Sequence, residues 1–316
     1  MTGAGPGEAD PDATIRLQPL TRAKVGSLGP AGQDWLSRLP ATLRELEREW
    51  QIRLGRPLPG GSAAYVVAAT RADGVPAVVK VVIEPDGLDA QAAILRRADG
   101  RGYVRLLGYD PDRRALLMEA LGPPLDHTAP APANWLDLLA DTLLAAWRAP
   151  EPADTRPDKA GDLAGLITTW WDRLGRPCSP AVYRQALAFA ERRRADPGEP
   201  VVVHGDPHPG NLLRVLRPRP GAETGYCFVD PDGFVTDRAY DLGVVLRDWT
   251  SQLSGADAEP TLRTYCSRLA DRTGVDAVRI WEWGFVERVS TGLYLKSFGA
   301  DGLAGRFLAS AEALVP

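Results

Sequence analysis

The sequence contains few of the residues from which metal centres and disulfide frameworks are built. Among its 316 residues there are three cysteines and three histidines. Cys178, Cys227 and Cys266 are far apart, their number is odd and none belongs to a CxxC pair, so the pattern favours neither a zinc ribbon nor a disulfide framework. Isolated cysteines are typical of proteins of the reducing cytoplasm, which is the location we expect.

Long apolar runs are also missing. The first fourteen residues, MTGAGPGEADPDAT, contain no apolar run, and no stretch approaches the ~18 uninterrupted apolar residues of a membrane span. We therefore expect neither a signal peptide nor a membrane partner. The formal net charge of -4 gives no indication of a nucleic-acid partner. The length and the 44% hydrophobic content suit one large globular unit or two lobes, as a monomer or homodimer.

The first third of the chain has the pattern of a small, mainly β lobe. Residues 1–30 are rich in Gly, Pro, Ala and Asp, and we expect a flexible tail there. Apolar residues at helical spacing predict a helix over 33–50. Two β-rich runs flank Asp73-Gly74, which is a strong hairpin signal. The elements expected next are a helix at 88–97 and strands at 104–109 and 115–121.

The rest of the chain has a mainly helical pattern. Aliphatic and Trp periodicity predicts helices at 134–148, 161–174 and 180–194, and helices fill most of 238–316. Short strands are expected at 201–203, 212–216 and 226–229. The predicted fold class is α+β, with a small, mainly antiparallel β N-lobe over 31–121 and a larger, mainly α-helical C-lobe over 122–316.

The segment His204-Gly-Asp-Pro-His-Pro-Gly-Asn211 is the most informative part of the sequence. It follows an apolar strand and precedes another short strand. Phosphoryl transfer needs a base for the attacking alcohol and oxygen ligands for magnesium, and Asp206 and Asn211 supply these groups five residues apart. Asp230 ends the next apolar strand, where a second Mg²⁺ ligand is required. The pattern predicts a kinase catalytic loop with Asp206 as base.

Lys80 is the second anchor of this interpretation, because a charge inside Val78-Val79-Lys80-Val81-Val82 is costly unless it is paired or used. In a kinase N-lobe such a lysine reaches the nucleotide phosphates. A solvent-facing lysine on an edge strand is the alternative. The preceding glycines let backbone N–H groups approach phosphates, and the strand end before the linker can pair with adenine. These further nucleotide-binding candidates are Gly60, Gly61, Ser62, Glu119 and Leu121.

The motifs HGDPHPGN, FVDPDG and DRAYDL together resemble the aminoglycoside phosphotransferase family. WLSRLP, RADGVPAVVKV and GRGYVRLLGYDPDRRALLMEAL extend the resemblance to the streptomycin 6-kinase and hydroxyurea phosphotransferase branch. The resemblance implies a two-lobed protein-kinase-like fold, use of ATP or GTP with Mg²⁺, and transfer of phosphate to an antibiotic-like small molecule. It also implies that His204 and Asp241 support the catalytic loop.

The sequence departs from this family at the position expected to pair with the lysine. The helix after Lys80 usually offers a glutamate, whereas this chain has Gln91. Either Gln91 contacts the lysine as a neutral partner, or Asp89 or Glu84 substitutes for it. An extra carboxylate, Asp232, follows Asp230, and we interpret it as a turn residue.

Other functions remain open at this level. His204, Asp206 and His208 could be the ligands of a metallohydrolase, although imidazole-based sites normally need more nitrogen ligands. A kinase of the same fold could act on a nucleoside or other non-aminoglycoside antibiotic, or on a metabolic amino alcohol or sugar. A catalytically silent nucleotide-binding module is a further alternative. For a cationic, streptomycin-like substrate, the acidic candidates in the C-terminal helices are Asp248, Asp257, Glu259, Glu282 and Glu287.

Overall fold

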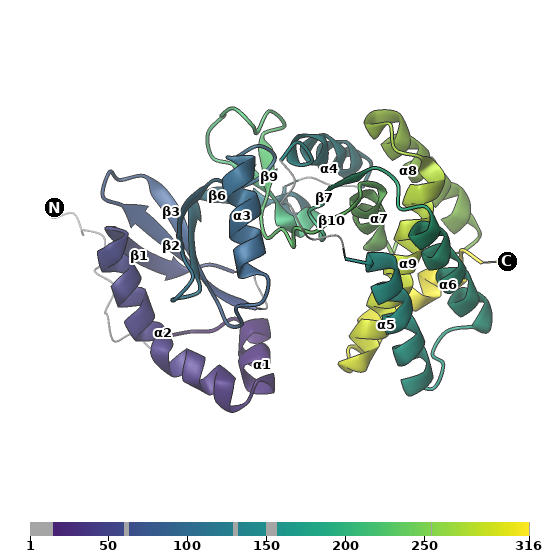
Figure 1. Cartoon of the computed structure of the whole chain (residues 1–316), viewed down its shortest axis with the longest axis horizontal. Helices are drawn as coiled ribbons and strands as arrows, with labels where there is room; N and C mark the ends of the chain where they lie inside the picture. The colour runs from purple at the N-terminus through teal and green to yellow at the C-terminus, as the bar shows by residue number, and fades with distance from the viewer. Residues whose placement is uncertain (1–14, 60–62, 129–131, 150–156, 254, 316) are drawn as a thin grey trace, which may run out of the picture. The chain divides into compact units, whose positions relative to one another are not determined.

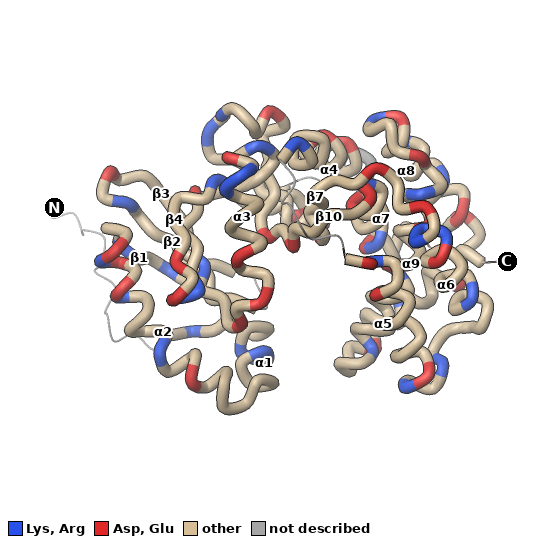
Figure 2. The backbone as a smooth tube through the Cα atoms, in the orientation of Figure 1, with Lys and Arg blue, Asp and Glu red and all other residues tan. Residues whose placement is uncertain are grey.

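The computed structural model describes residues 15–59, 63–128, 132–149, 157–253 and 255–315 (Figure 1). The chain divides into two compact units. The sheet unit comprises Met1–Ala92 with Arg105–Ala120, and the helical unit comprises Ala93–Val104 with Leu121–Pro316. Basic and acidic residues are interspersed over the elements of both units (Figure 2).

The sheet unit is built on five antiparallel strands in the order β1-β2-β3-β5-β4. The strands are β1 (Ile52–Pro57), β2 (Ala64–Arg71), β3 (Pro76–Val82), β4 (Leu106–Asp110) and β5 (Ala115–Glu119). The predicted hairpin is confirmed between β2 and β3. Gly74 has a φ of 79° in this turn and donates its N–H to Arg71 O at 2.9 Å, a conformation that favours glycine. The sequence analysis did not predict β1.

Helix α2 (Pro30–Glu49) packs its apolar side chains against one face of this sheet. Leu39 and Leu46 are buried in the same core as Val79 and Val81 of β3. Lys80 lies between these two valines, so the alternation of a strand places it on the opposite face. Helix α3 (Leu88–Ala98) supplies a contact to Lys80 there.

The expected flexible tail over residues 1–30 is wrong for residues 19–27. These residues form helix α1 (Pro19–Ser27), which starts with proline in its first turn, where the missing N–H costs nothing. Val25 is buried in the core of the sheet unit, and Thr21 donates from Oγ1 to Ala64 O at 3.3 Å. Burial of these two side chains explains why residues 19–27 are ordered. Residues 1–14 lie outside the described part of the chain.

The helical unit contains the predicted helices, shifted by a few residues at their ends. They are α4 (Pro132–Ala146), α5 (Lys159–Arg173), α6 (Pro180–Ala195), α7 (Ala239–Arg247), α8 (Ala258–Thr273), α9 (Ala277–Ser297) and α10 (Asp301–Glu312). A Cβ added to Gly243 of α7 would lie 2.6 Å from the backbone N of Gly284 in α9. The two glycines therefore let α7 and α9 pack at short range. Within the described ranges, no helix has both the length and the apolarity to cross a bilayer.

Two small sheets in the helical unit position its polar loops. Strand β7 (Pro200–Val202) pairs with β10 (Val235–Asp237), and β8 (Leu212–Val215) pairs with both β6 (Leu121–Pro124) and β9 (Tyr226–Phe228). Gly102 donates to Gly221 O at 2.7 Å and Val104 to Phe228 O at 2.9 Å. These bonds explain why residues 93–104 group with the helical unit, although the sequence prediction assigned them to the N-lobe.

Candidate active site

The predicted catalytic loop follows β7 and is held by a buried carboxylate of α7. Asp241 Oδ2 accepts the backbone N–H of His204 at 2.8 Å, and Oδ1 accepts that of Gly205 at 2.9 Å. The indole N–H of Trp147 donates to Oδ2 at 2.8 Å. Burial raises the pKa of Asp241 to about 6, although these three hydrogen bonds oppose the rise. Asp241 is thus placed to fix the start of the loop, which is the supporting role expected for it.

His204 is fully buried and bridges the loop to the strand that precedes Asp230. Its Nδ1 accepts the N–H of Asp206 at 3.1 Å, so the ring proton is on Nε2, which donates to Val229 O at 2.9 Å. The ring stacks on Tyr103 and meets the edge of Phe228. Burial lowers the pKa of His204 to about 4, which keeps the imidazole neutral.

The Asp206 carboxylate lies between Arg247 and His208. Oδ1 accepts from Nη2 of Arg247 at 2.8 Å, and Oδ2 lies 3.6 Å from Nε2 of His208. Burial opposes ionisation of Asp206, but the Arg247 guanidinium outweighs it and the pKa lies below its ordinary value. The carboxylate is therefore ionised at neutral pH, and 38% of its side-chain surface is accessible. An ionised, accessible carboxylate is what a base requires.

Asn211 and Asp230 come together at the ends of paired strands. Asn211 O accepts the N–H of Val229 at 2.9 Å, so Asp230 is the residue next to that contact. Asn211 Nδ2 donates to Asp206 O at 3.0 Å, which leaves Oδ1 as the end of the amide that can ligate a cation. Asp230 has a φ of 56°, an uncommon conformation for a residue with a Cβ and one that concentrates at functional sites.

This donor set fits magnesium rather than zinc. Mg²⁺ prefers hard oxygen ligands and is commonly held by one or two carboxylates together with the phosphates of a nucleotide. Among the described residues, no group of three or more His, Cys, Asp or Glu side chains is arranged to hold a metal ion. Asn211 and Asp230 provide an amide and a carboxylate oxygen, so they suit an ion whose remaining ligands come from phosphates and water.

The geometry argues against the metallohydrolase alternative. Both ring nitrogens of His204 are engaged with the chain, Nδ1 with Asp206 N and Nε2 with Val229 O. His208 Nδ1 accepts the N–H of Gly210 at 3.1 Å. His204 therefore has no nitrogen lone pair directed at a metal, and a site of His204, Asp206 and His208 would lack one of its three ligands.

Asp232 lies closer to this loop than a simple turn residue would. A Cβ added to Gly205 would lie 2.6 Å from Cβ of Asp232, and Asp232 N donates to His204 O at 2.8 Å. Desolvation by the surrounding chain, followed by the charges of Asp206 and other carboxylates, raises the pKa of Asp232 to about 6. Its side chain nevertheless keeps an exposed surface. Asp232 is a turn residue by backbone, but it is also part of the acidic surroundings of Asp206.

The predicted nucleotide-binding residues of the sheet unit are only partly described. Lys80 Nζ donates to Oε1 of Gln91 at 3.1 Å. Gly60, Gly61 and Ser62 lie outside the described residues.

The two strand-end residues have separate hydrogen-bond environments. Glu119 N already donates to Arg105 O, and Glu119 Oε1 accepts from Arg105 N at 2.8 Å. Leu121, in the helical unit, pairs with Val215 through β6 and β8.

The acidic candidates of the C-terminal helices separate into two groups. Glu282 pairs with Arg192 and Arg193, and Glu259 pairs with Arg263, so both are engaged away from the loop. Asp248 and Glu287 instead face Arg247, which also contacts Asp206. Asp257 directly precedes α8 and, among the described residues, forms no ion pair with this group. Asp248 and Glu287 are therefore the two that the fold brings to the candidate site.

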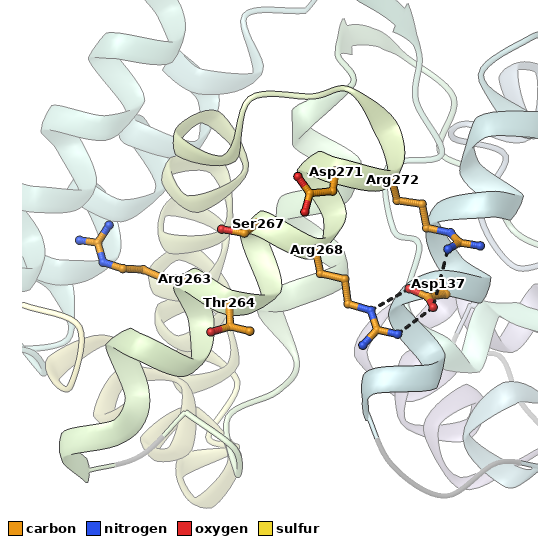
Figure 3. A pocket seen from close by; sticks show the side chains of 7 residues that line it. All are labelled: Asp137, Arg263, Thr264, Ser267, Arg268, Asp271 and Arg272. Atoms are coloured by element: carbon orange, nitrogen blue, oxygen red, sulfur yellow. Dashed lines mark hydrogen bonds and ion pairs between the residues drawn. The ribbon is translucent and has the colours of Figure 1, made fainter.

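An open surface pocket of about 790 Å³ lies on the helical unit, lined by residues of α4 and α8 and by none of the predicted catalytic loop. Figure 3 shows its lining side chains. Its arginines are already paired. Arg268 forms two hydrogen bonds with Asp137, and Arg272 forms two with Asp141. Because carboxylates already occupy the guanidinium groups of Arg268 and Arg272, the pocket offers no ready site for an anionic ligand.

Sequence reasoning missed Arg247 and Trp147 as members of this arrangement. Arg247 lies six residues after Asp241 on α7 and forty-one after Asp206. Nothing in local periodicity marks it, because an arginine at a helix C-terminus is ordinary. The one available signal was its position in an otherwise apolar helix, DLGVVLRD, where a charged residue needs a partner.

The chain is similar to antibiotic kinases over most of its length. A streptomycin 6-kinase of Streptomyces glaucescens is 25% identical over 303 residues, which cover 94% of this chain and 96% of the relative. A hydroxyurea phosphotransferase of Kitasatospora aureofaciens is 29% identical over 219 residues, which cover 68% of this chain and 62% of the relative.

Solved structures of kinases share the fold. A choline kinase of Streptococcus pneumoniae has a TM-score of 0.58 at 15% identity, covering 86% of this chain and 96% of its own. An aminoglycoside phosphotransferase of Streptomyces rimosus, solved with ADP and streptomycin, has a TM-score of 0.52 at 19% identity, covering 80% and 98%. The protein-kinase-like fold, with an antiparallel sheet N-lobe and a helical C-lobe, is thereby confirmed.

The model of the aminoglycoside/hydroxyurea antibiotic resistance kinases matches residues 49–299, which include the catalytic loop, Lys80 and Asp230. Because this match covers most of the chain, the protein belongs to the aminoglycoside/hydroxyurea antibiotic resistance kinase family and is a small-molecule phosphotransferase.

Proposed function

We propose that the protein transfers the γ-phosphate of ATP or GTP, with Mg²⁺, to a hydroxyl of an aminoglycoside-like antibiotic and so confers resistance. The observation that carries the proposal is the state of Asp206. Its carboxylate is ionised, accessible and held at one oxygen by Arg247, while the loop backbone is fixed by Asp241.

The proposed chemistry assigns one task to each group. Oδ2 of Asp206 accepts the proton of the substrate hydroxyl as that hydroxyl oxygen attacks the γ-phosphorus, and the bond from the γ-phosphorus to the β,γ-bridging oxygen breaks with release of ADP or GDP. His208 carries its ring proton on Nε2, because Nδ1 accepts the N–H of Gly210, so Nε2–H can donate to an oxygen that reaches Asp206 Oδ2. Asn211 and Asp230 would hold Mg²⁺, which, when bound, neutralises charge on the phosphates.

Lys80 is proposed to bind the nucleotide phosphates, with backbone N–H groups of Gly60, Gly61 and Ser62 as further donors. Glu119 and Leu121 are proposed to contact the purine ring of the nucleotide. Gln91 orients the lysine through the contact of 3.1 Å. A cation on the phosphates acts in both the ground and the transition state.

A cationic substrate is favoured by the charges around the loop. Asp206, Asp248 and Glu287 all face one guanidinium, that of Arg247, so negative charge remains in excess. Carboxylates hold guanidinium and ammonium groups by charge-assisted hydrogen bonds. Streptomycin carries such groups and is the leading substrate. The streptomycin 6-kinase relative supports this choice, and its 25% identity leaves a nucleoside antibiotic, another hydroxyl-bearing antibiotic or a metabolic amino alcohol as alternatives.

The test is a panel of aminoglycosides, nucleoside antibiotics, hydroxyurea and choline, each incubated with ATP or GTP and Mg²⁺. Nucleotide consumption is measured by a coupled assay, and the product by mass spectrometry. We expect one added phosphate on streptomycin with wild-type protein, and at most a small fraction of that product in the same time with Asp206→Asn as the matched control. The KM for streptomycin should rise with ionic strength more than kcat falls. Phosphorylation of only an uncharged compound would reject the cationic substrate and retain the kinase; no product with any compound would reject both.

A further inference from the structure

Arg247 is the group that contacts the proposed base most closely, and the contacts on its other edges fix its direction. Nη2 donates to Oδ1 of Asp206 at 2.8 Å. Nε donates to Oδ1 of Asp248 at 3.0 Å, and Nη2 also reaches Oδ2 of Asp248 at 3.3 Å. Nη1 lies 3.8 Å from Oε2 of Glu287. Only 14% of the Arg247 side chain is exposed, so the guanidinium is enclosed by carboxylates.

Glu287 is itself fixed by a second residue of α7, Tyr240. It lies on α9, is 4% exposed, and its Oε1 accepts the hydroxyl proton of Tyr240 at 2.6 Å. Tyr240 is on α7, like Arg247. The guanidinium is therefore restrained by Asp248, the next residue along the chain, and by the buried carboxylate of Glu287 on α9.

The backbone of Asp206 does not depend on Arg247. Asp206 N donates to His204 Nδ1, and Asp206 O accepts from Asn211 Nδ2 and from His208 N. The terminal torsion of an aspartate is broad, however, so these backbone contacts leave the carboxylate free to rotate. Arg247 and His208 are the partners of the carboxylate, and Arg247 makes the shorter contact, at 2.8 Å against 3.6 Å.

From this arrangement we infer that Arg247 is a positioning residue that holds Oδ1 of Asp206, so that Oδ2 is the oxygen presented to the substrate hydroxyl. The inference rests on the proposed function of Asp206 as base. Helix α7 then has two tasks: Asp241 in its first turn fixes the backbone of the loop, and Arg247 at its end fixes the side chain of the base.

The test compares Arg247→Met, Arg247→Lys and Arg247→Ala with wild type, using the substrate found in the panel. A misplaced base of this kind costs ~10²-fold, so we expect kcat of Arg247→Met to fall by about that factor while the KM for nucleotide is retained. Lysine lacks the planar fork, so Arg247→Lys should also be impaired. Millimolar guanidinium should restore part of kcat in Arg247→Ala, whereas methylammonium at equal ionic strength should not.

Arg279→Met is the matched control, because Arg279 is 16% exposed and pairs with Asp237 and Asp196 rather than with the loop. It should lower the melting temperature without changing kcat below that temperature. A crystal structure of Arg247→Met supplies a readout besides activity: the backbone of Asp206 should stay in place while its carboxylate rotates. If Arg247→Met does not fold, Arg247→Lys takes its place in both measurements.

The outcomes separate the inference from the proposed function. If wild type is active and folded Arg247→Met has an unchanged kcat, or if its Asp206 carboxylate has not moved, the inference is overturned and the kinase remains. Equal losses in Arg247→Met and Arg279→Met, with no rescue by guanidinium, would show a structural role and overturn it as well. If wild type phosphorylates nothing, both proposals are rejected.

Discussion

Lys80 of β3 and Gln91 of α3 form a hydrogen bond of 3.1 Å between Nζ and Oε1. Gln91 is 7% exposed, so its side of this hydrogen bond is shielded from solvent. The partner of the lysine is therefore the neutral amide of Gln91, whereas members of the family usually have a carboxylate at this position. A neutral amide orients the ammonium group without adding a charge of its own.

Replacement of either residue of this pair should change nucleotide use. Lys80→Ala should raise the KM for nucleotide and lower kcat, because the cation acts in both the ground and the transition state. Gln91→Glu should keep or improve nucleotide use, since a carboxylate can hold the same ammonium. Initial rates at varied ATP and GTP measure both. A loss of stability alone in Lys80→Ala would favour the solvent-edge interpretation, and a collapse of activity in Gln91→Glu would show that the site requires a neutral group.

Asp206→Asn should remove most turnover while the fold is retained. The amide keeps the shape of the side chain but cannot take a proton, and loss of a general base typically costs ~10²–10⁴-fold in rate. Single-turnover rates and circular dichroism of the same preparation provide the measurement. A kcat close to that of wild type would remove Asp206 from the mechanism.

Asp230→Asn should increase the Mg²⁺ requirement, because a neutral amide is a poorer ligand than a carboxylate. Asp232→Asn is the matched control: it removes a carboxylate two residues away that we do not assign to the ion. Activity titrated with Mg²⁺ should shift to higher concentrations in the first variant and much less in the second. The same shift in both variants would mean that general negative charge, rather than ligation by Asp230, sets the requirement.

The buried His204 should make the protein less stable as the pH falls. Burial lowers its pKa in the folded protein to about 4, from an ordinary value of 6.5. Between these values the unfolded chain binds a proton that the folded protein does not, so this contribution to stability is lost as the pH falls through the window. From pH 7 to pH 5 the loss amounts to ~2 kcal/mol.

Urea unfolding of wild type and His204→Gln at the two pH values tests this. Glutamine does not titrate, so the variant should lose less free energy of unfolding on acidification, whatever its stability at pH 7. Asp241 contributes in the opposite sense, because burial raises its pKa to about 6, and its contribution is present in both proteins. The same pH dependence in both proteins would show that His204 does not titrate in this range.

The sequence by itself predicted the chemistry of the loop and most of the elements around it. Asp206 and Asn211 are five residues apart in one segment, and Asp73-Gly74 marks a hairpin. Both features can be predicted from a few neighbouring residues. The helices and strands could be predicted for the same reason, because periodicity is a property of neighbouring residues. Helix α1 was not predicted, since its order depends on burial against distant parts of the sheet unit, as the contact of Thr21 with Ala64 shows. Strand β1 was not predicted either, because it is defined by its pairing with β2 rather than by a pattern of its own.

Only the tertiary structure decided what the charged groups of the site contact. Whether Gln91 partners Lys80 depends on the packing of α3, and the sequence left Asp89 and Glu84 equally open. Arg247 reaches Asp206 across forty-one residues because α7 brings both of its ends to the loop, whereas Glu282, on the same helix as Glu287, pairs with Arg192 and Arg193 instead. An ion pair depends on distances of a few ångströms between side chains from separate elements, and such distances are fixed by how the helices pack.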